Sequence, residues 1–169
     1  RNILEITNQH TGTLLYASPM QIRLLASDRS DSMMPSLKKV ISTSAGIGYD
    51  VCMDFKKRFG LTVSQAYGII EIGLPMINFE KSEEHPDAVG FALPGFTVDI
   101  LDDNYKVLPD GAVGHLAIKG PGMFDAYLFP SRMRSEVLKN GYFLTADYAS
   151  KTKEGLVKIE GRAKSVINI

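Results

Sequence analysis

Residues 37–63, LKKVISTSAGIGYDVCMDFKKRFGLTV, carry the pattern that decides the fold. Residues 37–43 predict a strand through Val40 and Ile41, which are apolar and β-branched, and residues 61–63 begin another. Between them, Asp50 can cap a helix whose apolar residues recur on one face, and Gly60 suits its C-terminal end. A strand, a helix and a strand at this spacing predict a parallel α/β unit.

The same alternation extends upstream, but the pattern changes near Gly90. Residues 13–16 predict a further strand, and Ser18 followed by Pro19 predicts the start of a helix. Beyond Gly90, short alternating segments separated by turns predict an antiparallel sheet or a small barrel, with one helix over residues 131–139. The strands expected there cover residues 96–100, 115–119, 142–144 and 156–159.

Composition excludes several classes of protein. The chain has 169 residues, of which 44% are hydrophobic, so it can bury a sizeable core. Nineteen basic residues balance 19 acidic ones, which argues against binding to nucleic acid. No apolar run approaches the ~20 residues of a membrane-spanning helix. The single cysteine excludes internal disulfides and thiolate metal clusters, and we expect a cytoplasmic protein.

Two residues in the segment that follows the strand at 61–63, Tyr67 and Glu71, could contact a ligand. In open α/β sheets, ligands bind beyond the carboxyl ends of the strands, and we expect this strand to end near Ser64. Tyr67, followed by Gly68, offers a flat ring on a mobile turn for stacking on a base. Glu71 offers a carboxylate to a hard cation. Taken alone, a strand-to-loop junction with a surface glutamate is the commoner explanation.

Three other segments carry candidate binding groups. The small residues at 42–48 would let a ligand approach the backbone closely. Asp147 could accept hydrogen bonds from both hydroxyls of a ribose, and Arg162 could hold a phosphate or a ribose oxygen. Each segment also has an ordinary explanation, as a strand–helix loop, a turn aspartate or an exposed basic turn.

Taken in order, these segments resemble the adenylate-forming superfamily of acyl-CoA synthetases, peptide-synthetase adenylation domains and luciferases. The family pattern Tyr-Gly-x-Thr-Glu is similar to Tyr67-Gly68-Ile69-Ile70-Glu71, and the pattern Gly-Trp-Phe-x-Thr-Gly-Asp to residues 141–147. The resemblance covers essentially the whole chain. The other similar segments are residues 44–48, 90–95, 108–116, 126–130 and 161–165.

The resemblance implies an activity and a set of roles. Members of this superfamily use ATP and Mg²⁺ to convert a carboxylic acid to an acyl-adenylate, releasing pyrophosphate, and then pass the acyl group to coenzyme A or a carrier thiol. The implied nucleotide contacts are Tyr67 with Gly68 on the adenine, the backbone of Gly46, Ile47 and Gly48 on its other side, Asp147 on the ribose diol, and Arg162 on ribose or phosphate. Glu71 would help to bind Mg²⁺, and Ala66 and Gly73 would lie near the acid.

The resemblance also implies a fragment. Residues 1–89 would end a βαβ parallel-sheet subdomain, residues 90–163 would form a small antiparallel distorted β-barrel, and residues 164–169 would begin the hinge to a C-terminal domain. The family's phosphate-binding loop and its catalytic lysine are expected outside this chain, which also starts at Arg1 and ends in an apolar run. We therefore expect no catalytic residue here and no adenylation by the isolated chain.

Departures from the family pattern leave an alternative open. Ile70 stands where threonine is usual, His115 where glutamate is usual, and Ser165 where the hinge aspartate is usual. Ala146 replaces glycine, a mild change if the local φ is negative. Among these departures, Ile70 and Ser165 favour a non-catalytic nucleotide- or acyl-binding relative as the second hypothesis.

Three expectations concern packing alone. We expect Ile69, Ile70 and Ile72 to lie in the core and Cys52 to be a buried, inert thiol. We expect residues 56–58, which are all basic, to form a solvated helix face.

Overall fold

The structure is a computed structural model that describes residues 2–162. The chain divides into two compact units. The first unit comprises residues 1–66 and 78–88, and the second unit comprises residues 67–77 and 89–169. In the part of the chain that the structure describes, no helix combines the length and the apolar character needed to cross a bilayer.

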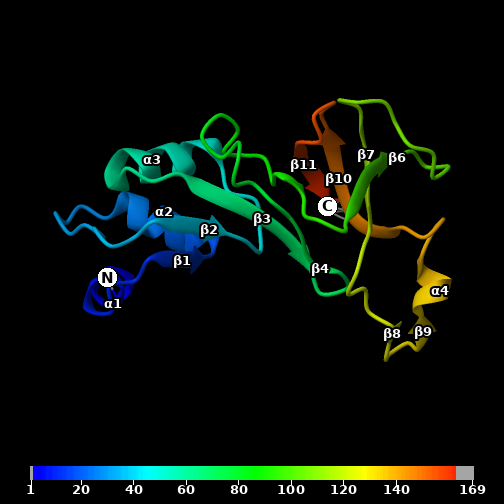
Figure 1. The fold of residues 1–169 in the computed structure, drawn as a ribbon, viewed down its shortest axis with the longest axis horizontal. Coiled ribbons are helices and arrows are strands. Elements are labelled where there is room, and N and C mark those ends of the chain that lie inside the picture. Colours follow the sequence, from blue (N-terminus) through cyan, green and yellow to red (C-terminus); the bar gives the residue numbers. More distant parts are fainter. Residues whose placement is uncertain (1, 163–169) are drawn as a thin grey trace, which may run out of the picture. The chain divides into compact units, whose positions relative to one another are not determined.

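The first unit contains the predicted parallel α/β arrangement. Strands β1, β2 and β3 run parallel, with β2 in the middle, and α2 and α3 lie against each other (Figure 1). Helix α1 was not predicted. The elements are α1 (Asn2–Gln9), β1 (Leu14–Ala17), α2 (Pro19–Ser27), β2 (Lys39–Ser42), α3 (Tyr49–Phe59) and β3 (Val63–Ile69), of which the last continues into the second unit.

The helix ends follow local sequence signals. Ser18 caps α2 through a reciprocal capping box with Gln21, as its sequence context predicts. Gly60 ends α3 in the left-handed conformation, with φ +71°. The prediction that Asp50 caps α3 is wrong, because Gly48 is the cap and Asp50 lies in the first turn. Its carboxylate still complements the positive end of the helix dipole there.

The core of the first unit lies between its helices and its parallel strands. Ile22 of α2, Phe55 of α3 and Val63 of β3 are almost completely buried, and Cys52 is buried as expected. The expectation of a wholly solvated basic face on α3 is wrong. Arg58 is largely buried and donates to Asp28 Oδ1 at 3.1 Å, so it ties the end of α3 to the loop after α2.

The second unit is built around a four-stranded antiparallel sheet. The strand order is β11-β10-β7-β6, and these strands lie side by side in Figure 1. Among residues 2–162, no pairing joins β6 to β11, so the antiparallel sheet is confirmed but stays open. The elements are β4 (Gly73–Ile77), β5 (Phe91–Ala92), β6 (Thr97–Leu101), β7 (Val113–Lys119), β8 (Ala126–Tyr127), β9 (Arg132–Met133), α4 (Arg134–Val137), β10 (Phe143–Lys151) and β11 (Val157–Arg162).

The helix predicted over residues 131–139 is shorter than expected. Only α4 is helical, because Arg132 and Met133 pair with β8 and Leu138 is already extended. A turn at Asn140 and Gly141, both with positive φ, then leads into β10. Pairing in a short β-hairpin with β8 thus overrides the helical pattern at residues 132–133.

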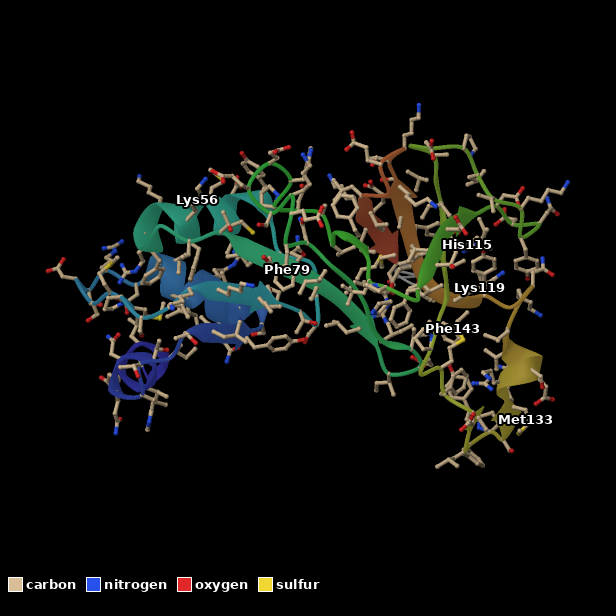
Figure 2. All side chains as sticks on the ribbon, viewed as in Figure 1. Lys56, Phe79, His115, Lys119, Met133 and Phe143 are labelled. Carbon is tan, nitrogen blue, oxygen red and sulfur yellow. The ribbon has the colours of Figure 1, made fainter. Side chains whose placement is uncertain are left out.

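The core of the second unit lies on the sheet. Met76, Leu116 and Val157 are fully or almost fully buried, and Phe143 packs with them. In Figure 2, Phe143 extends from the start of β10. Ile72 is buried as expected, but the expectation for Ile70 is wrong. Ile70 is 99% exposed, because the turn between β3 and β4 points it outward.

Candidate functional site

Tyr67 lies within strand β3 and not on a mobile turn. The prediction that this strand ends near Ser64 is wrong, because β3 continues to Ile69. Gly68 allows the start of β4 to approach closely, since a Cβ atom at this position would lie 2.8 Å from the Gly73 carbonyl oxygen. Gly73 itself has φ +87°, a conformation that other residues rarely adopt. The ring of Tyr67 is therefore held on a regular strand, which is a rigid base for a binding surface.

A β-bulge in β10 presents Asp147. The register of β10 shifts against β7 between Leu144 and Tyr148, and Ala146 within the bulge has φ +62°. The Thr145 hydroxyl accepts a hydrogen bond from the Asp147 backbone N–H and donates one to the Leu116 carbonyl, each at 3.2 Å. The departure from glycine at Ala146 is therefore not mild, because the φ there is positive.

The structure brings together three of the residues singled out from the sequence. The Tyr67 hydroxyl donates to Asp147 Oδ2 at 2.6 Å, although the two residues are 80 positions apart. Arg162, the register partner of Asp147 on β11, places its Nε 3.6 Å from Asp147 Oδ1. The Asp147 side chain is 14% exposed and that of Arg162 is 72% exposed. A half-buried ring, a carboxylate and a cation thus meet within the second unit.

The pKa of Tyr67 reflects this environment. Burial raises the pKa of its hydroxyl above the ordinary value, and the hydrogen bond to Asp147 raises it further. The hydroxyl therefore remains a proton donor to Asp147 throughout the physiological pH range.

Glu71 is held by a second tyrosine. The Tyr127 hydroxyl donates to Glu71 Oε1 at 2.9 Å, and the Phe124 backbone N–H donates to the Glu71 carbonyl at 2.8 Å. Burial, and then the hydrogen bond to Glu71, raise the pKa of Tyr127. Within residues 2–162 no group of three or more His, Cys, Asp or Glu side chains could by itself hold a metal ion. A magnesium ion needs fewer, since it often binds one or two carboxylates together with substrate phosphates.

The small-residue loop belongs to the first unit. Gln65 is buried, accepts a hydrogen bond from the Ile47 N–H at 3.2 Å and donates to the Pro86 carbonyl at 2.7 Å. Ile47 is itself buried, which anchors the loop. The space that a side chain would take up at Gly46 and Gly48 is open, so the backbone there is accessible to a ligand.

The remaining predicted residues are distributed over both units. Ala66 belongs to the first unit and is buried, while Gly73 lies in the second unit beside Gly68. The residues expected to form the hinge, 164–169 with Ser165 among them, lie outside the described residues. Gln65 and Thr145 lie beside or within the segments singled out from the sequence. No sequence signal predicted that their side chains would hold the loop and the bulge by hydrogen bonds.

Comparisons with known proteins agree on one family. The sequence model described as AMP-binding enzyme matches residues 1–128. The mitochondrial acyl-coenzyme A synthetase ACSM3 of Rattus norvegicus is 27% identical over 172 residues, covering 98% of this chain and 30% of the relative.

Solved structures of similar proteins give the same result. ATP-bound MatB from Rhodopseudomonas palustris has a TM-score of 0.86 at 29% identity, covering 96% of this chain and 33% of MatB. The amide bond synthetase McbA from Marinactinospora thermotolerans has a TM-score of 0.86 at 26% identity, covering 95% of this chain and 34% of McbA. The chain thus spans about a third of the length of these relatives. Because the family's sequence model matches more than half of its residues, the chain belongs to the AMP-binding enzyme family.

Proposed function

We propose that this chain forms part of the nucleotide-binding region of an AMP-forming acid–thiol ligase. The whole enzyme would join a carboxylic acid to ATP, giving an acyl-adenylate and pyrophosphate, and would then transfer the acyl group to a thiol, that of coenzyme A. The meeting of Tyr67, Asp147 and Arg162 in the second unit is the observation that carries this proposal. The family match supports it independently.

The three side chains suit the parts of a nucleoside monophosphate. The Tyr67 ring offers a flat face on which adenine can stack. The carboxylate of Asp147 can accept from both ribose hydroxyls, because each of its oxygens has two lone pairs. Arg162, whose side chain is largely exposed, can reach a ribose oxygen or the phosphate.

Glu71 is proposed as a ligand of the magnesium ion that accompanies ATP. Its carboxylate is a hard oxygen donor, which is the kind that Mg²⁺ prefers, and Tyr127 fixes one of its two oxygens. Attack of one anion, the substrate carboxylate, on another, the α-phosphate, is slowed by repulsion, and a bound cation reduces that repulsion.

The loop in the first unit is proposed to contribute backbone contacts to the adenine. The open space at Gly46 and Gly48 and the anchoring of Ile47 by Gln65 support this role. Ala66 and Gly73 are proposed to lie near the acid, whose identity stays open.

The division into residues 1–89, residues 90–163 and a hinge from residue 164 is proposed from the resemblance. The catalytic lysine and the phosphate-binding loop would then lie in the rest of a longer protein. Coenzyme A is favoured as the acceptor because ACSM3 is named as an acyl-coenzyme A synthetase. McbA is named as an amide bond synthetase, so an amine is the second candidate acceptor. A cytoplasmic location stays a prediction.

One observation favours a second candidate function, a nucleotide-binding relative without turnover. Ile70 is fully exposed where the family pattern has threonine, so an apolar side chain replaces a hydroxyl beside Glu71. Such a protein would bind the nucleotide but would not form the adenylate.

Acid-dependent exchange of pyrophosphate into ATP distinguishes the two candidates. We expect the longer protein that contains this chain to catalyse exchange with at least one acid from a panel of aliphatic, aromatic and dicarboxylic acids. The isolated chain should give none. Nucleotide binding by the longer protein without exchange would favour the non-catalytic relative. Exchange by the isolated chain would contradict the placement of the catalytic lysine elsewhere.

A further inference from the structure

We propose that Tyr67 is also a positioning residue, whose hydroxyl sets the orientation of the Asp147 carboxylate that receives the ribose. This inference rests on the proposed function and assigns to the hydroxyl a role that is separate from that of the ring. The ring would contact the base through its face, whereas the hydroxyl acts at the ring edge on a different part of the nucleotide site.

The backbone of the bulge leaves the carboxylate of Asp147 to be oriented by its neighbours. Thr145 holds the Asp147 N–H, which fixes where the side chain starts but not which way its oxygens face. Tyr67 binds Oδ2 at 2.6 Å, a short charge-assisted hydrogen bond. With that oxygen held, the rotation of the carboxylate is restricted.

Arg162 contributes less to this orientation than Tyr67 does. Its Nε lies 3.6 Å from Asp147 Oδ1, beyond good hydrogen-bond geometry, and its side chain is 72% exposed. Exposed ion pairs are weak because water and salt screen them. Tyr67, by contrast, is half-buried, so its bond to the carboxylate is less screened.

Binding of a ribose does not require Tyr67 to leave. The bond from Tyr67 takes up one of the two lone pairs of Oδ2, and both lone pairs of Oδ1 remain for other donors. The two ribose hydroxyls can then donate one to each oxygen, with the tyrosine still bonded. The hydroxyl is thus expected to strengthen ribose binding and not to compete with it.

The second unit offers a matched pair for comparison. Tyr142 donates to Asp99 Oδ2, also at 2.6 Å, and Lys151 holds the other oxygen of that carboxylate at 2.6 Å. Tyr142→Phe removes the same hydroxyl from the same kind of bond as Tyr67→Phe. It therefore controls for the loss of a tyrosine–aspartate bond outside the proposed site.

The test is calorimetric titration of the wild-type protein and the two variants with AMP and with 2′,3′-dideoxy-AMP, which keeps the base and the phosphate but lacks both ribose hydroxyls. We expect Tyr67→Phe to bind AMP about tenfold more weakly, as for loss of a hydrogen bond to a charged group, and to bind dideoxy-AMP as the wild type does. Tyr142→Phe should bind both nucleotides as the wild type does.

Three results would overturn the inference. An equal loss for both nucleotides in Tyr67→Phe would assign the hydroxyl to stacking or to stability alone. Unchanged or tighter AMP binding in that variant would show that the hydroxyl does not help the ribose. A wild-type protein that binds neither nucleotide would contradict the proposed function itself, and with it this inference.

Discussion

Replacing Ala146 by glycine should stabilise the protein. Ala146 lies in the β10 bulge with φ +62°, a region that glycine adopts readily and alanine does not. Its side chain is exposed, so removing the methyl group gives up little buried apolar surface. The backbone conformation therefore decides the sign of the effect.

The expected gain in the free energy of unfolding is the difference between two contributions of opposite sign. A left-handed conformation costs an L-residue about 1–2 kcal/mol, and glycine removes that cost. The greater freedom of glycine in the unfolded chain costs about 0.5–1 kcal/mol. Ala146→Gly should therefore raise the free energy of unfolding by about 0.5–1 kcal/mol, measured from urea unfolding curves of the variant and the wild type.

Ala126 provides a control, because it is an alanine whose backbone is extended. Ala126 lies in strand β8, an extended conformation in which glycine has no advantage. Ala126→Gly should lower the free energy of unfolding by about 0.5–1 kcal/mol. If Ala146→Gly destabilised the protein as much as Ala126→Gly does, the bulge conformation described for Ala146 would be refuted.

Three further predictions concern single side chains. Ser44 has φ +80°, so Ser44→Gly should also stabilise the protein in urea unfolding, and a loss of stability would count against that loop conformation. Burial raises the pKa of Cys52 to about 11, so its thiol should resist a thiol reagent at neutral pH until the protein is unfolded; rapid labelling of the folded protein would show that the thiol is accessible. Burial also raises the pKa of Asp99, but hydrogen bonds from Lys151 and Tyr142 outweigh it and lower that pKa overall. The stability that these bonds contribute is present above the ordinary carboxyl pKa and is lost as the pH falls through the lowered one, so Asp99→Asn should lose less stability than the wild type on acidification.

Local signals predicted the parts of the fold that depend on neighbours in sequence. The Ser18 capping box and the left-handed Gly60 lie within one turn of the residues they act on, so the ends of their helices could be predicted. The structure differs where a distant segment decides. Arg58 pairs with Asp28, 30 positions away, instead of facing water. The shortened helix is a different case, because residues 132–133 form a local hairpin with β8.

In the candidate site, too, the sequence predicted individual residues but not the contacts between them. Tyr67 and Asp147 were both singled out, but no periodicity or spacing in the sequence indicates that they touch. The bulge that presents Asp147 depends on the register of β10 against β7, and this register is a property of the sheet and not of residues 145–147. The exposure of Ile70 follows from the turn that separates β3 from β4.

The most direct measurement is a calorimetric titration of AMP into the wild-type protein, Asp147→Asn and Asp99→Asn. Both aspartates accept a tyrosine hydroxyl at 2.6 Å, so the two variants remove the same charge from the same kind of bond. We predict that Asp147→Asn binds AMP at least about tenfold more weakly, because hydrogen bonds to a charged group are stronger than neutral ones, and that Asp99→Asn binds as the wild type does. Equal affinities in all three proteins, or no binding by the wild type, would contradict the assignment of a nucleotide site to Asp147.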